Sequence, residues 1–265
     1  MVNTSFMSTF LFDQIIFGPV KSRRLGVSLG VNLLPTDNKV CSFDCVYCEC
    51  GWTPKNRVQK AVLPPRELVR QMLEEKLTEM VESNELPDVI TFAGNGEPTL
   101  HPEFEEIIDD TIELRDRLTP KARIAVLSNA TMLHKPSVVR ALLKVEDNIQ
   151  KLDSGIEETI RKIDCPASSF KLKAVVENLK SFDGKVIIQT LFLRGNHKDS
   201  IIDNTTETEL SEWLKLLAKI KPSKVMIYTI DRDTPATGLE KVKLDELQLI
   251  ASRVRAAGFE VQVSG

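Results

Sequence analysis

The sequence lacks the features of a membrane, secreted or strongly charged protein. No stretch approaches the ~20 consecutive apolar residues that a membrane-spanning helix needs. The N-terminal segment is apolar in places, but it has no basic leading part and is interrupted by Asp13 and Gln14, which is unlike a signal peptide. The formal net charge is only −3, so the composition gives no general attraction to nucleic acid or to an anionic membrane.

Cysteine is scarce, and its distribution is unlike a disulfide framework. The chain has five cysteines, and four of them fall within residues 41–50. We therefore expect a cytoplasmic protein, in which thiols stay reduced and available to a metal. At 265 residues, 42% hydrophobic and 28% charged, the chain is an ordinary globular protein that can bury a full core.

Helical and strand patterns alternate along the chain after residue 60. Hydrophobic periodicity predicts helices at 65–84, 102–116, 135–144, 169–182, 207–220 and 244–257. Short apolar runs predict strands at 25–34, 88–94, 123–129, 148–154, 185–193, 224–230 and 258–263. Such alternation indicates an α/β fold with an open parallel sheet and right-handed crossovers. About six units are too few for an eight-fold barrel, so we expect a partial (β/α)6 barrel.

We expect one domain over residues 1–265, with residues 1–24 as an N-terminal extension that packs on the barrel. Active sites of such sheets lie at the carboxyl ends of the strands. The cysteine-rich segment follows the first predicted strand, so it should lie at that end.

Three of the clustered cysteines have the spacing Cys41-x3-Cys45-x2-Cys48. Three thiolates can hold three irons of a [4Fe–4S] cluster and leave the fourth iron open, whereas four-thiolate clusters carry electrons. A zinc site with Cys50 as the fourth ligand is an alternative, and so is a redox-only cluster. Structural zinc usually uses two separated Cys pairs, whereas these cysteines share one short loop and the three histidines lie far away. The spacing favours the cluster with an open iron.

Two motifs together resemble the radical S-adenosylmethionine (SAM) superfamily. The first is Cys-x3-Cys-x-aromatic-Cys, with Tyr47 as the aromatic residue. The second is Gly94-Asn95-Gly96-Glu97-Pro98, which follows the second predicted strand and is similar to the glycine-rich segment of that superfamily. The resemblance covers roughly residues 15–265. It implies a [4Fe–4S] cluster on Cys41, Cys45 and Cys48, SAM as cofactor, and reductive cleavage of SAM to a 5′-deoxyadenosyl radical that abstracts hydrogen from a substrate.

The resemblance also implies which residues bind SAM. Tyr47 is expected to pack against the adenine, or to pack in the core behind the cluster. Gly94, Asn95 and Gly96 would let backbone carbonyls approach the methionine ammonium. Glu97 would pair with a charge, hold this turn, or cap the helix that begins near Pro102.

Later strand ends supply further SAM-binding candidates. Asp153 stands where the family places a polar residue on the ribose hydroxyls, although it is equally suited to cap the next helix. Ser128, at the end of the third strand, is a similar candidate. Gln189 belongs to the strand that supports adenine, and because side chains alternate, only one of Gln189 and Thr190 can face the interior.

No catalytic residue is assigned firmly from the sequence. Cys50 is a spare thiol, a hydrogen-atom donor or an inert buried cysteine. Arg232 would bind a substrate carboxylate or phosphate, or form a surface ion pair.

Segments 18–32, 95–98 and 228–232 resemble a wyosine-synthase-like branch whose substrates are largely unassigned. True tricyclic wyosine synthases modify a tRNA guanosine with pyruvate and carry a second cluster on extra N-terminal cysteines, but no cysteine precedes Cys41 here. RNA modification is one expected use. The alternatives are an activating enzyme that installs a radical on a partner protein, and a non-catalytic electron-transfer module, which would not need the segments 94–98 and 153–154. The expected partners are a reductant such as flavodoxin or ferredoxin and a tRNA or protein substrate, without a membrane.

Overall fold

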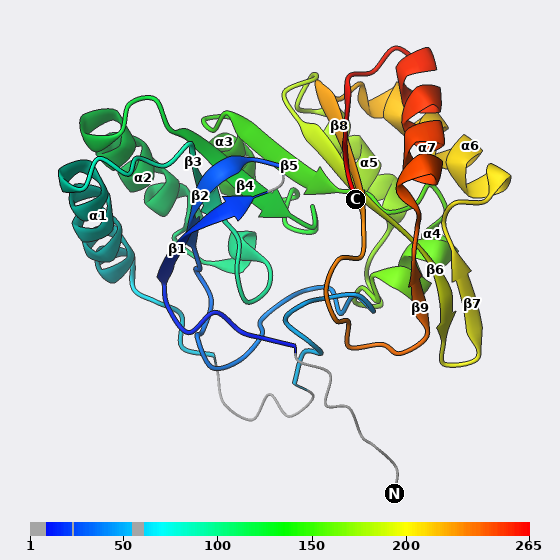
Figure 1. Cartoon of the computed structure of the whole chain (residues 1–265), viewed down its shortest axis with the longest axis horizontal. Coiled ribbons are helices and arrows are strands. Elements are labelled where there is room, and N and C mark those ends of the chain that lie inside the picture. Colours follow the sequence, from blue (N-terminus) through cyan, green and yellow to red (C-terminus); the bar gives the residue numbers. More distant parts are fainter. Residues whose placement is uncertain (1–8, 23, 55–60) are drawn as a thin grey trace, which may run out of the picture.

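The computed structural model describes residues 9–22, 24–54 and 61–265, and its centre is one curled sheet (Figure 1). Within this part of the chain seven strands run parallel, and they are neighbours in sequence order. They are β2 (Gly26–Val31), β3 (Val89–Phe92), β4 (Arg123–Ser128), β5 (Asp147–Lys151), β6 (Ile187–His197), β8 (Lys224–Thr229) and β10 (Val261–Ser264).

The helices lie on the outer face of this sheet (Figure 1). They are α1 (Arg66–Glu82), α2 (Phe104–Leu118), α3 (Pro136–Leu142), α4 (Glu157–Ile163), α5 (Leu172–Lys180), α6 (Glu207–Ile220) and α7 (Leu244–Ala256). Six strand–helix units followed by a last strand confirm the predicted open partial barrel. No helix in the described residues has the length and apolar character to cross a bilayer.

Local sequence explains where several helices begin. Pro136 occupies the first turn of α3, where a missing N–H costs nothing. The hydroxyl of Thr206 accepts a hydrogen bond from the Glu209 N–H, which is the N-terminal half of a capping box. Helix α6 then ends at Lys221 in a left-handed conformation. These signals place α6 at the bounds that the sequence predicts.

Three strands and one helix were not predicted. Strand β1 (Ile16–Ser22) pairs antiparallel with β2 at the sheet edge, where Pro19 is tolerated because an edge strand needs no donor on its outer side. Strand β6 continues to His197, and its last part pairs with β7 (Ser200–Asp203) and β9 (Leu239–Lys241). The strand predicted at 148–154 ends at Lys151, and α4 follows it. Helix α4 buries only Ile160 and Ile163, so it is too short to show a clear helical period of apolar residues in the sequence.

The inner face of the sheet encloses a lumen that is closed at one end. Side chains alternate along β8, so Val225 and Ile227 pack toward the helices while Met226 faces inward. Met226 joins a small apolar cluster near the amino ends of the strands, made of Leu25, Val89, Ala125, Ile149, Ile187 and Met226. Leu25 comes from the turn between β1 and β2, so this turn covers that end. The carboxyl ends remain open and receive the cysteine loop.

Candidate active site

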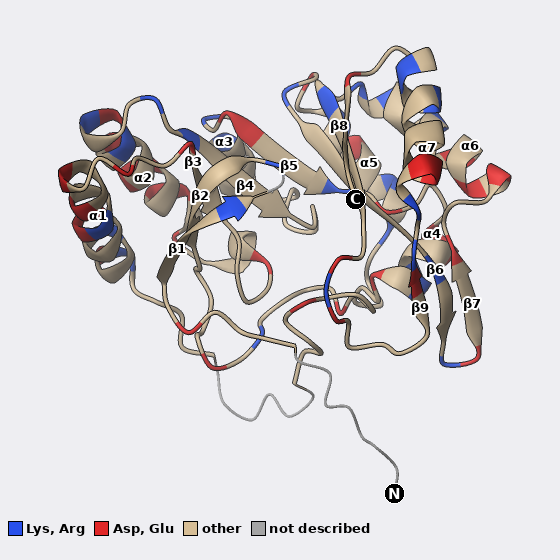
Figure 2. Cartoon of the chain, in the orientation of Figure 1, with Lys and Arg blue, Asp and Glu red and all other residues tan. Residues whose placement is uncertain are grey.

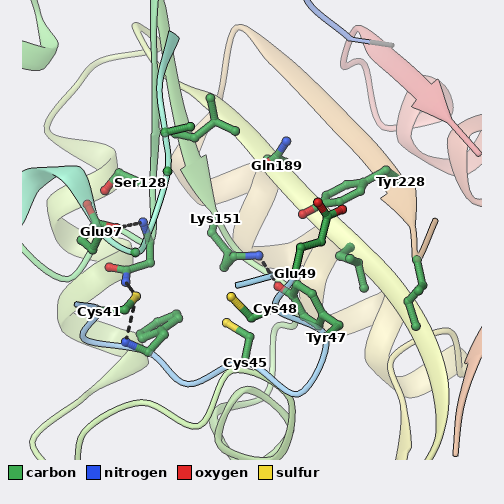
Figure 3. Close-up of a pocket in the computed structure, with 18 of the residues that line it drawn as sticks. Cys41, Cys45, Tyr47, Cys48, Glu49, Glu97, Ser128, Lys151, Gln189 and Tyr228 are labelled. Atoms are coloured by element: carbon green, nitrogen blue, oxygen red, sulfur yellow. Dashed lines mark hydrogen bonds between the residues drawn. The ribbon is translucent and has the colours of Figure 1, made fainter. Parts of the chain in front are cut away.

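The loop after β2 brings the three predicted cluster ligands to one cavity of about 300 Å³ (Figure 3). Cys41, Cys45 and Cys48 all line this cavity at the carboxyl ends of the strands. Residues far away in the sequence hold this loop. The backbone N–H groups of Asp44 and Val46 donate hydrogen bonds to carbonyls at the end of α4 (both 2.9 Å). The loop position therefore depends on tertiary hydrogen bonds.

N–H donors contact the Cys41 sulfur, and a buried cation lies near the cysteine loop. The Cys41 sulfur accepts from the Phe43 N–H (3.4 Å) and the Asn129 amide (3.6 Å). The buried Lys39 ammonium donates to the Gly51 carbonyl (2.8 Å) and lies 3.3 Å from an Asp44 carboxylate oxygen. Such donors stabilise thiolates, so the set fits ligands of an iron–sulfur cluster.

The individual thiols differ in acidity. A hydrogen bond from Cys50 and the charge of Lys39 outweigh burial and lower the pKa of Cys48 to about 6. Burial raises the pKa of Cys41 to about 12. Cys50 itself does not line the cavity, and its sulfur also lies 3.4 Å from the Gly94 carbonyl oxygen, so Cys48 and that carbonyl compete for its one S–H proton. Cys50 therefore lies behind the site as a hydrogen-bond partner of Cys48 and of the glycine turn.

The glycine turn is fitted directly against the cysteine loop. Val40 N–H donates to Asn95 O (2.9 Å) and Glu97 N–H donates to Val40 O (3.1 Å). At Gly96, which has φ +137°, a Cβ atom would lie 1.9 Å from the Val40 carbonyl oxygen. At Gly94 it would lie 2.5 Å from Asn32 Oδ1. Only glycine permits this approach of the two segments.

Glu97 lines the cavity, but protein groups already occupy its carboxylate. One oxygen accepts from the Thr99 N–H (3.2 Å) and hydroxyl, and the other accepts from the Asn129 N–H (2.7 Å). Glu97 thus caps the short 3₁₀ helix at Pro98–Leu100 instead of the helix near Pro102. Burial raises its pKa, although these hydrogen bonds oppose the shift. The geometry makes Glu97 a brace between the ends of β3 and β4.

Tyr47 and Lys151 lie together on the opposite wall (Figure 3), and both bond to the buried Asp153 behind them. The Tyr47 hydroxyl bonds to an Asp153 oxygen and receives a hydrogen bond from Lys151 Nζ, which also lies 3.0 Å from Asp153. The other Asp153 oxygen accepts from the Leu191 N–H (2.8 Å). Asp153 is therefore fully enclosed and does not line the cavity.

The structure brings most of the predicted SAM-binding residues to this cavity. The lining includes Tyr47, Gly94, Gly96, Glu97, Ser128 and Gln189. Gln189 faces inward, while the Thr190 hydroxyl accepts from Trp213 and donates to the Leu152 carbonyl. Asn95 lies outside the lining, since its buried amide bonds to backbone atoms of Phe12 and Pro35.

The lining residues without a role predicted from the sequence include Arg24, Lys39, Lys151 and Tyr228. The period of β5 was a usable signal for Lys151, because it shares a face with the inward Ile149. Arg232 also lines the cavity and forms an ion pair with Glu49 (2.8 Å). Among the described residues, no group of three or more His, Cys, Asp or Glu side chains is placed to hold a single metal ion.

Curated relatives match most of this chain. It is 29% identical over 252 residues, 94% of its length, to a protein of Brachyspira hyodysenteriae named GTPase Obg, and it spans only 34% of that relative. It is 30% identical over 240 residues to a UPF0026 protein of Methanocaldococcus jannaschii, covering 89% of this chain and 70% of the relative.

Solved structures share the fold. A radical SAM methyltransferase from Sphaerobacter thermophilus has a TM-score of 0.66 at 12% identity, covering 89% of this chain and 65% of that chain. TYW1 with a lysine–pyruvate adduct has a TM-score of 0.60 at 14% identity, covering 86% and 73%. SuiB of Streptococcus suis bound to SAM has a TM-score of 0.61 at 16% identity, covering 86% and 49%.

A family model supports the same assignment from the sequence. The model described as the Radical SAM superfamily matches residues 38–206, which include the three cysteines and the glycine turn. SAM and a [4Fe–4S] cluster are the cofactors of this family. The chain belongs to the radical SAM superfamily.

Proposed function

We propose that this radical SAM enzyme uses a [4Fe–4S] cluster on Cys41, Cys45 and Cys48 to cleave SAM reductively and to abstract hydrogen from a substrate. The observation that carries the proposal is that these thiols share one cavity with the Gly94–Glu97 turn at the carboxyl ends of the strands. When bound, the reduced cluster supplies the electron that splits the C5′–S bond of SAM into methionine and a 5′-deoxyadenosyl radical.

The protein groups have separate tasks in this proposal. The turn at Gly94 and Gly96 packs its backbone against Asn32 and Val40 without a side chain in between, and it lines the cavity where the methionine end of SAM would bind. Tyr47 presents its ring to the cavity for the adenine, and its hydroxyl is fixed by Asp153. Asp153 is thus a positioning residue that acts through Tyr47, instead of a ligand of the ribose.

The lysine–pyruvate adduct of TYW1 requires an amine that can lose its proton. Lys151 is the lysine that faces the lumen from β5, and its ammonium contacts Asp153 and the Tyr47 hydroxyl. Burial alone would lower the pKa of Lys151, but the Asp153 carboxylate outweighs it and the pKa is raised. The proposal therefore does not assign pyruvate condensation to Lys151. Modification of RNA stays a prediction from the sequence resemblance.

The test is SAM cleavage by anaerobically reconstituted protein, with dithionite in place of a reductant such as flavodoxin or ferredoxin. We expect 5′-deoxyadenosine and methionine in equal amounts, measured by liquid chromatography. Cys45→Ala should lose both the cluster absorbance and the cleavage. A wild-type protein with an intact cluster that cleaves no SAM would contradict the proposal.

A further inference from the structure

The lumen below the cysteines is layered. Its closed end is the apolar cluster that includes Leu25 and Met226. One step toward the cysteines, Lys151, Gln189 and Tyr228 line the cavity from β5, β6 and β8 (Figure 3). The space that continues from the SAM site therefore has an apolar floor and a polar wall.

Arg24 enters this layer from the turn between β1 and β2. It lines the cavity, and its guanidinium carbon lies 4.4 Å from the centroid of the Tyr228 ring. The backbone beside it is fixed, because its carbonyl accepts from the Gln262 amide of β10 (3.0 Å) and its N–H donates to the Ser22 hydroxyl (3.3 Å). Arg24 is therefore held in place by both edges of the curled sheet.

The guanidinium of Arg24 is not satisfied by the described protein atoms. Its Nη1 atom is buried and has no hydrogen-bond partner among the described residues. The other charged side chains of the cavity differ, since Lys151 pairs with Asp153 (3.0 Å) and Arg232 pairs with Glu49 (2.8 Å). A buried N–H without a partner is costly, and native proteins seldom keep one without a ligand or water to fill it.

Many charged side chains on the outer helices are paired with each other. Acidic and basic side chains are interspersed on the outer helices (Figure 2), and they pair between neighbours, as Arg70 of α1 does with Glu113 of α2 (2.7 Å). The buried, unpartnered Nη1 of Arg24 belongs to a side chain that lines the lumen, where a ligand can reach it. A guanidinium binds carboxylate and phosphate oxygens in a planar, two-bond geometry.

We propose that the substrate carries an oxyanion, a carboxylate or a phosphate, that binds Arg24 against the Tyr228 ring in the polar layer next to the closed end of the lumen. This inference rests on the proposed function, because it places the rest of the substrate between Arg24 and the SAM site.

The test is calorimetric titration of sodium phosphate and of sodium acetate into reconstituted protein saturated with S-adenosylhomocysteine. We expect one of the two anions to bind, and Arg24→Gln to weaken that binding by about tenfold or more. Arg24→Lys keeps the positive charge but loses the planar guanidinium. Its affinity for the anion should lie between those of the wild type and Arg24→Gln. Arg253→Gln is the matched control, since it removes one positive charge from an ion pair with Glu207 on the outer helices and should bind like the wild type.

The two titrations distinguish a phosphoryl group from a carboxylate as the oxyanion of the substrate. Stronger binding of phosphate indicates a phosphoryl group, and stronger binding of acetate indicates a carboxylate. Equal affinity in the wild type and in a folded Arg24→Lys or Arg24→Gln protein overturns the inference. Loss of anion binding in the presence of S-adenosylhomocysteine also overturns it, because Arg24 would then hold the methionine carboxylate. Titration needs no SAM cleavage, so a failure of the proposed function is detected separately.

Discussion

Replacing Gly96 with alanine should separate the glycine turn from the cysteine loop. A Cβ atom on Gly96 would lie 1.9 Å from the carbonyl oxygen of Val40 and 2.5 Å from its carbonyl carbon. Both are backbone atoms next to Cys41, and Val40 is bonded on both sides to the turn. Relief of the clash must therefore move the backbone that precedes the first cluster ligand.

Gly258 offers a matched control for the magnitude. Its φ is +90°, so an alanine there pays for a left-handed backbone, but nothing lies within 4 Å of the added Cβ. We expect Gly258→Ala to lower the free energy of unfolding by about 1 kcal/mol. Gly96→Ala has a similar conformational cost and adds the clash with the Val40 backbone. We therefore expect Gly96→Ala to lower the free energy of unfolding by about 4 kcal/mol or more. The difference of about 3 kcal/mol is the contribution of the clash.

Denaturant unfolding of the purified proteins measures both losses, and iron content after reconstitution measures the effect on the site. Gly96→Ala should also hold less iron than Gly258→Ala, because Val40 carries the displacement to Cys41. If the two variants lost the same stability and bound the same iron, the tight contact between the two segments would not be a requirement for the site.

Three further predictions concern the cysteines and charges. Cys50→Ala should keep the cluster absorbance and iron content, because Cys50 bonds to the Gly94 carbonyl outside the cavity; loss of the cluster would make Cys50 a ligand. Lys39→Met should lower the reduction potential of the cluster in an EPR-monitored titration, because a buried cation beside the ligands favours the added electron; an unchanged potential would refute this. Asp110→Asn should cost about 1–3 kcal/mol at neutral pH, because hydrogen bonds from Arg66 lower the pKa of Asp110. That stabilisation is present above the unfolded pKa of about 3.9 and is lost as pH falls through the lowered value, so the two unfolding curves should converge in acid.

Local patterns predicted the parallel units well, because buried strands and amphipathic helices carry their own period. The bounds of α6 follow from Thr206 and the apolar spacing alone. Strand β1 was missed because Pro19 disrupts the strand pattern, and only its edge position makes that residue acceptable. The short strands β7 and β9 exist because β6 extends beyond the sheet and offers them a partner, which is a tertiary fact.

At the candidate site, too, the sequence predicted local features but not those that depend on tertiary contacts. The spacing of Cys41, Cys45 and Cys48 predicted which thiols would meet, and they do line one cavity. The family resemblance implied that Asp153 binds the ribose hydroxyls, with a helix cap as the alternative. It did not predict that Tyr47 and Lys151, 106 and 2 residues away, would enclose that carboxylate. Polar residues at strand ends are predictable, but the direction of each side chain depends on its partners.

The cysteine loop is positioned by both halves of the barrel. Val40 bonds to the turn after β3, Val46 N–H bonds to the end of α4, and the Val46 carbonyl accepts from the Ala236 N–H in the segment between β8 and β9 (3.2 Å). These contacts join residues that are far apart in sequence, so no local motif encodes them. The motif of three cysteines specifies which atoms bind iron, whereas the surrounding barrel specifies where that iron lies. The substrate must then be recognised by residues outside the motif, and Arg24, in the turn between β1 and β2 that accepts a hydrogen bond from Gln262 of β10, is placed to do so.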